Sequence, residues 1–190
     1  EIPRARRLVC AAARETFEEC GILLADHLDG SPVSDARRYH GSRAQLERHE
    51  LAFSEFLARE SLSLAADRLR PFDHWITPAV EKKRYDTRFF LAALPEGQEP
   101  DDLTSEVDLT FWARPAEILG AFRDGRAMLL PPTWTQLRHL AEFPDVASAL
   151  AADRTIRPIE PEILTHRARV RVGFDSSDEY CAHFLAGHPR

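Results

Sequence analysis

The sequence predicts an α/β (α+β) protein, in which helices cover both faces of a mixed β-sheet. Two observations predict this class. Segments whose apolar residues recur at helical spacing alternate with short segments rich in aromatic and aliphatic residues, as strands are. The chain has 190 residues, 44% of them hydrophobic, and can therefore bury the core of one sizeable domain with an appendage.

The first third of the chain is predicted to be helical around one polar loop. Apolar residues at helical spacing predict an amphipathic helix over residues 5–20, which Gly21 can end with a left-handed cap. Residues 26–41 are polar and predict a loop. Residues 42–66 carry leucine and phenylalanine at helical spacing and predict one or two helices, either as a covering layer or partner interface, or as a lid that selects substrate.

The rest of the chain carries the predicted strands and the remaining helices. The run at 87–94 is almost continuously apolar, which is typical of a strand buried on both faces. Pro115 opens a helix, because proline is favoured in a first turn. We expect strands at 73–78, 87–94, 107–112 and 167–174, helices at 115–125, 133–143 and 146–152, and an extended segment at 156–161.

Composition narrows the classes of function. The net charge of −6 argues against binding to a nucleic-acid backbone. No apolar run approaches the roughly 20 residues needed to span a bilayer, so we expect no membrane segment. Three scattered cysteines indicate packing residues in a reducing, cytoplasmic (bacterial-type) compartment. The eight histidines have no metal-ligand spacing, and we expect them at the surface.

Residues 14–22, here called the acidic run, carry the strongest chemical signal. A helix advances about 100° per residue, so Glu15, Glu18 and Glu19 fall within one narrow arc. Such like charges repel one another unless a cation neutralises them, and Mg²⁺ or Mn²⁺ takes oxygen ligands. The run therefore predicts a metal site suited to phosphate chemistry, the alternative being a solvated acidic helix face.

The acidic run resembles the downstream half of the Nudix box, G-x5-E-x7-R-E-U-x-E-E-x-G-U, in which U is a bulky aliphatic residue. Thr16 departs at a U position but keeps the branched carbon. The upstream half does not fit, because Arg6 stands where the box has a glutamate and the glycine would precede residue 1. The positions that fit are Arg14, Glu15, Glu18, Glu19, Gly21 and Ile22.

The likeness extends to a branch of the Nudix hydrolases in which a long insertion splits this box, the branch of the mammalian peroxisomal coenzyme A diphosphatase Nudix 19 and its bacterial relatives. Its Ala-Ala-x-Arg-Glu-Thr-Phe-Glu-Glu run is similar to residues 11–19. In this branch a Pro-Gly-Gly segment lies far upstream, so we expect the first strands and the Gly-Gly loop to be absent from residues 1–190. Residues 75–78, 84–90 and 130–133 are also similar, and those between 156 and 180 more weakly.

This resemblance implies a Nudix fold and an organisation in two parts. A Nudix hydrolase domain is expected over residues 1–143, with a loop and a helical insertion at 26–70. A C-terminal extension is expected over residues 144–190. The insertion helices and the extension could both serve a homodimer.

The resemblance also implies a reaction, namely the metal-dependent hydrolysis of the pyrophosphate in a nucleoside diphosphate linked to another moiety. Water attacks phosphorus, and Mg²⁺ or Mn²⁺ is the implied cofactor. The partner is a small nucleotide substrate, with coenzyme A or acyl-CoA as the first expectation and ADP-ribose or an NADH-type dinucleotide as the alternative. A catalytically silent Nudix-fold binding module is the alternative from another class.

The site residues follow from the same resemblance. Glu18 and Glu19 are the expected metal ligands, and Glu15 is a metal ligand or the group that activates water. Arg14 would orient the glutamates through an i,i+4 pairing with Glu18. Glu106 is the expected further metal-binding acid from a later loop.

Other candidates leave alternatives open. Asp108 competes with Glu106, and either could be a surface acid. Arg84, Arg88 and the lysines Lys82 and Lys83 could bind the substrate's phosphates, although all of these except Arg88 could equally be solvated. Arg88 lies in a buried-looking strand and must therefore be paired, either with Asp86 or with the glutamates.

Overall fold

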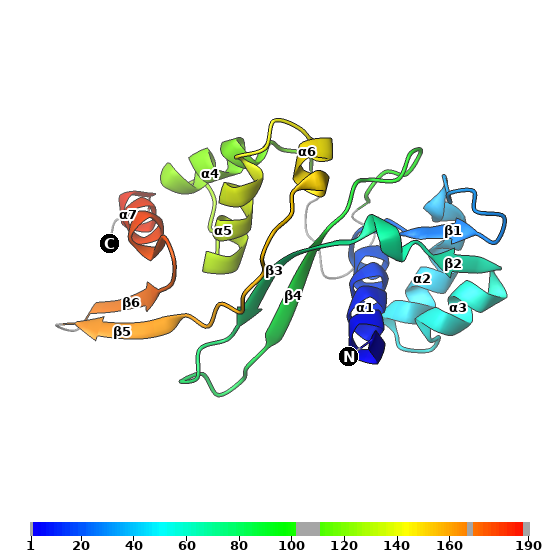
Figure 1. The fold of residues 1–190 in the computed structure, drawn as a ribbon, viewed down its shortest axis with the longest axis horizontal. Coiled ribbons are helices and arrows are strands. Elements are labelled where there is room, and N and C mark those ends of the chain that lie inside the picture. The colour runs from blue at the N-terminus through cyan, green and yellow to red at the C-terminus, as the bar shows by residue number, and fades with distance from the viewer. Residues whose placement is uncertain (1, 102–110, 167–168, 188–190) are drawn as a thin grey trace. The chain divides into compact units, whose positions relative to one another are not determined.

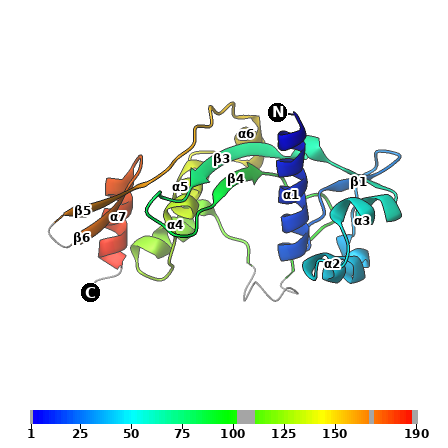
Figure 2. The same cartoon turned by 90° about the horizontal axis from the view of Figure 1, so that it is seen from below.

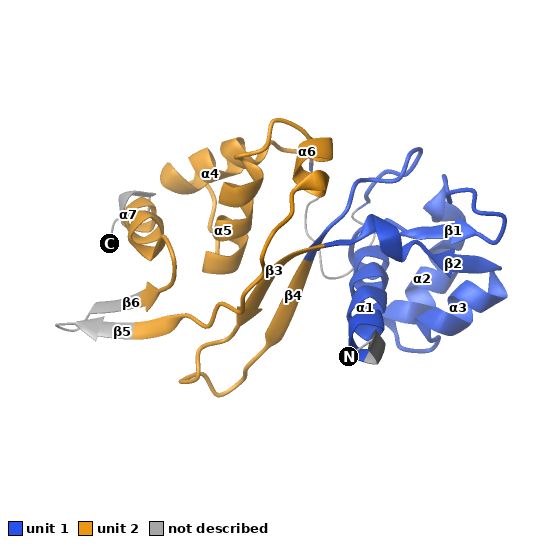
Figure 3. Cartoon of the chain, in the orientation of Figure 1, with its two compact units in different colours: residues 1–70, 90–111 blue, residues 71–89, 112–190 orange. Residues whose placement is uncertain are grey.

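The computed structural model describes residues 2–101, 111–166 and 169–187 and divides the chain into two compact units (Figures 1 and 3). Unit 1 comprises residues 1–70 and 90–111, and unit 2 comprises residues 71–89 and 112–190. The mixture of helices and strands confirms the α/β (α+β) class. No described helix is long and apolar enough to cross a membrane.

The acidic run lies on the last turns of the first helix, α1 (Ile2–Cys20). Ala13 and Phe17 are buried on one face of this helix, at the four-residue spacing that places side chains above one another. Gly21 follows with φ +74°, and its N–H donates to the carbonyl of Phe17 at 3.1 Å. The structure thus confirms both the helix and its left-handed end.

The rest of unit 1 packs around the buried face of α1. The helices α2 (His40–Glu47) and α3 (Phe53–Arg59) stand beside α1 in both views (Figures 1 and 2), and α2 packs against it. Phe56 of α3 stacks on Phe17 with ring centroids 5.5 Å apart. The strand β1 (Ala25–His27) pairs with β2 (Leu62–Leu64) in antiparallel register. The single turn η1 (Ala36–Tyr39) lies between β1 and α2, and the single turn η2 (Ala66–Arg68) follows β2.

Unit 2 contains the remaining helices and the larger part of the remaining strands; Arg70, Phe90 and Leu91, at strand ends, belong to unit 1. The strand β3 (Arg70–Ile76) pairs with β4 (Asp86–Leu91), and β5 (Glu162–His166) pairs with β6 (Arg169–Gly173). Its helices are α4 (Pro115–Arg123), α5 (Pro131–Leu140), α6 (Val146–Ala151) and α7 (Ser177–Gly187). Its core is aromatic, since Phe122, Trp134 and Tyr180 are buried together with Leu129.

The sequence predictions for the elements were mostly confirmed, with the following differences among the described residues. Residues 62–65 are not helical, because Ser61 has φ +55° and Leu62 and Leu64 pair with β1. The strand β4 ends at Leu91 and is exposed or half-buried rather than buried on both faces. The strand β5 and the helix α7 had no sequence prediction. The expected strand at 107–112 falls almost wholly outside the described residues.

Candidate functional site

The carboxylates of the acidic run differ in their exposure. The Glu15 side chain is 56% exposed, Glu19 is also exposed, and the Glu18 side chain is only 14% exposed. Arg14 lies beside them, with its guanidinium 3.3 Å from the Glu15 carboxylate and 3.8 Å from that of Glu18. The i,i+4 pairing of Arg14 with Glu18 expected from the sequence is therefore present.

Glu18 is the most unusual of these carboxylates. Its Oε1 is buried and has no hydrogen-bond partner among the described residues. Burial raises the pKa of Glu18, and Glu15 and Glu47 act in the same direction, whereas Arg14 and His49 oppose them. A buried carboxylate oxygen without a donor is unfavourable, so this atom is suited to a cation or a donor that binds to it.

A buried arginine from α2 holds the C-terminal end of α1. Arg43 donates through Nε to the carbonyl of Glu18 at 3.1 Å and through Nη1 to the Asp101 carboxylate at 2.5 Å. Its side chain is only 3% exposed, and Glu47 lies 3.5 Å from Nε on the same helix. A buried guanidinium needs such acceptors, so this cluster joins α1, α2 and the segment at Asp101.

The backbone just after α1 is held by a second buried polar side chain. Gln98 accepts a hydrogen bond from the N–H of Leu23 at 2.8 Å and donates to the carbonyls of Leu23 and Val33 at 2.9 and 2.7 Å. The N–H of Asp101 also donates to the carbonyl of Cys20 at 3.1 Å. The segment 98–101 therefore fixes where the acidic run ends.

Oxygen donors on α1 match the type of ligand that Mg²⁺ and Mn²⁺ prefer. The unpartnered Glu18 Oε1 and the exposed Glu15 and Glu19 carboxylates fit such a cation. Within the described ranges, however, no three His, Cys, Asp or Glu side chains form a group that could hold a metal ion. The acidic helix thus offers ligands of the right chemistry but not a complete coordination sphere.

The structure brings only some of the predicted site residues together. Arg14, Glu15, Glu18 and Glu19 share the end of α1 in unit 1, whereas Lys83, Arg84 and Arg88 belong to unit 2. Glu106 and Asp108 lie outside the described residues.

Three of the predicted phosphate-binding residues, Arg88, Arg84 and Lys83, each contact a side chain of unit 2. Arg88 pairs with Asp86, as one of the two alternatives expected. Arg84 pairs with Glu160 at 2.5 Å and donates to the carbonyl of Thr77 at 2.9 Å. The ammonium of Lys83 lies 5.1 Å from the centroid of the Tyr85 ring.

One histidine expected at the surface is buried. His74 is 6% exposed, and its Nε2 lies 2.6 Å from the Asp86 carboxylate. The isolated position of this histidine in the sequence gave no sign of a partner twelve residues away. The hydrogen bond between His74 and Asp86 is the largest cause of the lowered pKa of the Asp86 carboxyl.

Sequence reasoning also missed Arg43 and Gln98. Arg43 stands in a helix whose apolar spacing does not include it, and Gln98 stands in a polar loop. Asp101 lies 58 residues from Arg43, and Leu23 lies 75 residues from Gln98, so no local pattern could have identified these contacts.

The chain is similar to a known protein family and to several of its vertebrate members. The family model described as the NUDT19 Nudix domain matches residues 2–140. Acyl-coenzyme A diphosphatase NUDT19 of Xenopus laevis is 28% identical over 149 residues, covering 71% of this chain and 39% of that protein. The human protein of the same name is also 28% identical over 149 residues, with the same coverage of both chains.

Two further comparisons agree. Putative nudix hydrolase 7 of Caenorhabditis elegans is 27% identical over 152 residues, covering 80% of this chain and 50% of that protein. The crystal structure of a NUDIX hydrolase from Alicyclobacillus acidocaldarius superposes with a TM-score of 0.68 at 28% identity, covering 76% of this chain and 65% of the other. The chain thus spans half or less of the length of these curated relatives, and its fold matches that of the crystallised hydrolase.

Proposed function

Since the chain belongs to the NUDT19 branch of the Nudix hydrolases, we propose that it hydrolyses the pyrophosphate of coenzyme A or an acyl-CoA, with Mg²⁺ or Mn²⁺ as its cofactor. The Xenopus and human relatives are acyl-coenzyme A diphosphatases by name, which supports this substrate class. The proposed products are 3′,5′-ADP and 4′-phosphopantetheine, or its acyl derivative, formed when water attacks phosphorus in the P–O–P bridge. A homodimer, a cytoplasmic location and the division at residue 143 stay predictions from the sequence.

The observation that best supports the proposal is the unpartnered Oε1 of Glu18 beside two exposed carboxylates. A folded protein seldom keeps a buried carboxylate oxygen without a donor unless something else binds there. A divalent cation, when bound, offsets the negative charge of the pyrophosphate and favours attack by water.

The residues of α1 then take distinct roles in the proposal. Glu18 and Glu19 would hold the cation. Glu15, whose side chain is 56% exposed, would either join them or accept the proton of the attacking water. Arg14, 3.8 Å from Glu18, would keep that carboxylate charged and oriented.

Residues beyond α1 complete the proposed site. Glu106 is kept as the further metal-binding acid from a later loop. Arg88, Arg84 and Lys83 are kept as phosphate-binding residues, and the first two would then exchange their present carboxylate partners for the substrate.

The test is hydrolysis by the full-length protein of coenzyme A, acetyl-CoA, ADP-ribose and NADH, each with Mg²⁺, with Mn²⁺ and with EDTA. We expect metal-dependent release of 3′,5′-ADP from coenzyme A. Loss of a metal ligand generally costs orders of magnitude, so Glu18→Gln should lower kcat at least about 100-fold. The control Glu142→Gln, at an exposed acid after α5, should leave kcat unchanged.

The outcomes separate the alternatives. If the protein hydrolyses ADP-ribose or NADH faster than coenzyme A, the proposed substrate is wrong, but the proposed hydrolysis of a pyrophosphate still stands. Full activity in EDTA, or in Glu18→Gln, would refute the metal site on α1. If the full-length protein hydrolyses no pyrophosphate, the catalytically silent binding module is the better description.

A further inference from the structure

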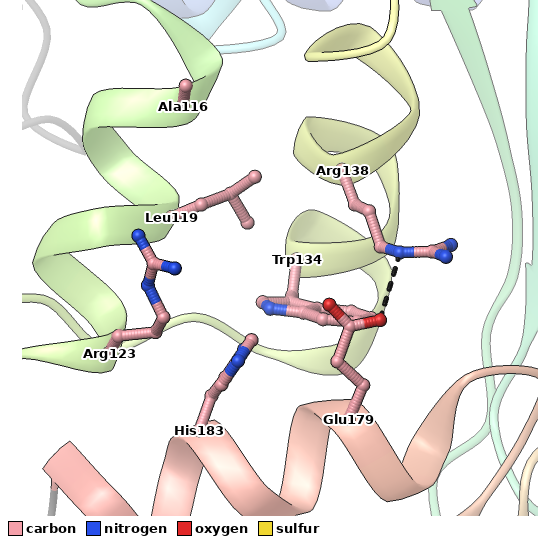
Figure 4. A pocket seen from close by; sticks show the side chains of 7 residues that line it. All are labelled: Ala116, Leu119, Arg123, Trp134, Arg138, Glu179 and His183. Carbon is pink, nitrogen blue, oxygen red and sulfur yellow. Dashed lines mark ion pairs between the residues drawn. The ribbon is translucent and has the colours of Figure 1, made fainter.

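A small cavity lies between α4, α5 and α7, and all of its lining residues belong to unit 2 (Figure 4). Its volume is about 230 Å³. Leu119 and Ala116 contribute apolar wall, whereas Arg123, Trp134, Arg138, Glu179 and His183 contribute polar groups. Three different helices therefore direct polar side chains into one partly open cavity.

Trp134 supplies the first sign that the cavity is built for a ligand. The residue is 1% exposed, and its Nε1 is buried with no hydrogen-bond partner among the described residues. The indole N–H is a donor only, and buried tryptophans usually pair it. Figure 4 shows Nε1 at the end of the ring that faces Arg123 and His183, so an acceptor inside the cavity would satisfy it.

The charges around this donor supply the second sign. Arg138 pairs with Glu179 at 3.2 Å, and its guanidinium lies 5.9 Å from the centroid of the Trp134 indole. That pair is neutral as a whole. In the described part of the chain, no carboxylate lies within ion-pair distance of Arg123, so the cavity retains one positive charge next to the unpaired N–H.

His183 supplies a further donor from α7. Its ring lies 6.3 Å from the Trp134 indole, centroid to centroid, in an edge arrangement. An imidazole carries at least one N–H whatever its protonation state. Figure 4 shows Arg123, Trp134 and His183 around the same side of the cavity, while Glu179 lies toward Arg138.

We propose that this cavity binds a small anionic oxygen group, which accepts a hydrogen bond from Trp134 Nε1 and pairs with Arg123 and His183. Such a group has several acceptor oxygens, as a phosphate or a carboxylate does, and Arg binds both. The cavity volume of about 230 Å³ has room for such a group, and Leu119 supplies apolar wall beside it. None of the proposed metal ligands on α1 lines this cavity.

The test uses the indole N–H resonances of the three tryptophans in ¹⁵N-labelled full-length protein. Inorganic phosphate is titrated at constant ionic strength, and acetate is titrated in a parallel arm. We expect the Trp134 resonance to shift and saturate. The resonance of Trp75 should stay in place, because its Nε1 already donates to Asp73 at 2.6 Å.

A pair of arginine variants controls for general charge effects. Arg123→Gln should weaken the binding of phosphate at least about tenfold, because it removes the charge that pairs with the anion. Arg126→Gln, at an exposed arginine paired with Asp124 at 2.7 Å, should leave the affinity unchanged. Both positions are on the surface, so neither change should unfold the protein.

Each outcome decides the proposal. Saturation by phosphate alone assigns the site to phosphate groups, and saturation by acetate as well assigns it to anionic oxygens in general. No shift of Trp134 with either anion refutes it. Equal affinity in wild type and Arg123→Gln, or shifts shared by all tryptophans, also refute it, because the anion would then be acting through bulk charge.

Discussion

Replacing Gly21 with alanine should destabilise the protein by two separate effects. The first is the backbone, because φ is +74° and a left-handed conformation costs a residue with a Cβ about 1–2 kcal/mol. The second is crowding. A Cβ at this position would lie 2.7 Å from Asp101 Oδ2 and 2.9 Å from Arg43 Nη1.

The crowding cannot be relieved without loss. The Arg43 side chain is 3% exposed and bonded to the carbonyl of Glu18, so Asp101 must move and its 2.5 Å ion pair must open. Opening a buried pair costs about 3–5 kcal/mol, and because Asp101 is 18% exposed we take about 2 kcal/mol. Gly21→Ala should therefore cost about 3–4 kcal/mol in total.

Gly30→Ala is the matched control. Gly30 has φ +85°, yet nothing lies within 4 Å of the position its Cβ would take. This variant should lose only the backbone contribution, about 1–2 kcal/mol. The assay is urea unfolding, with free energies from linear extrapolation and an unchanged m-value.

The double variant Gly21→Ala/Asp101→Ala identifies the source of the crowding. Once Asp101 is removed, the alanine at position 21 should add little beyond the backbone cost, giving a coupling energy of about 1 kcal/mol or more. If Gly21→Ala and Gly30→Ala cost the same within about 0.5 kcal/mol, or if the double variant is additive, the crowding argument is wrong.

Three other predictions follow from buried polar groups. Gln98→Glu should lower the free energy of unfolding in urea by about 2–3 kcal/mol, because the new side chain cannot donate the two hydrogen bonds of Gln98 and brings a charge into a buried place. A loss below about 1 kcal/mol would contradict this. Arg43→Met should cost about 3 kcal/mol, since it leaves Asp101 without its cation, and Arg43→Lys should cost less. The hydrogen bond with His74 lowers the pKa of Asp86 below its usual 3.8. Stability from Asp86 is therefore present above pH 3.8 and lost as pH falls through the folded-state pKa. Asp86→Asn should therefore flatten the acid limb of the curve of unfolding free energy against pH.

The parts of the fold that sequence predicted best are those set by local patterns. The helix α1, its end at Gly21 and the helix begun by Pro115 each depend on residues within one or two turns. The β2 strand at Leu62–Leu64 was read as helix because three residues carry too short a pattern, and pairing with β1 decided the outcome. Local propensity was overridden there by a partner far away in the sequence.

In the candidate site, too, the sequence predicted the groups set by local spacing and missed those set by distant contacts. The carboxylates of α1 could be identified from spacing and resemblance, because their chemistry requires them on adjacent turns of one helix. The groups that hold that helix end could not, since Arg43 and Gln98 act on backbone atoms that any residue would supply. Their importance shows only in their burial, and whether a polar side chain is buried depends on how all of unit 1 packs.

Gly21 has both a local role, which the sequence predicts, and a long-range role, which only the structure shows. Its local role, ending α1 with a positive φ, would tolerate other small residues that adopt the left-handed region, such as asparagine. Its long-range role would not, because any Cβ meets Asp101 and Arg43. The glycine after the acidic run is therefore required by packing against the segment at Asp101 as much as by the helix end. Since Arg43 also holds the carbonyl of Glu18, the same contact sets the backbone position of a proposed metal ligand.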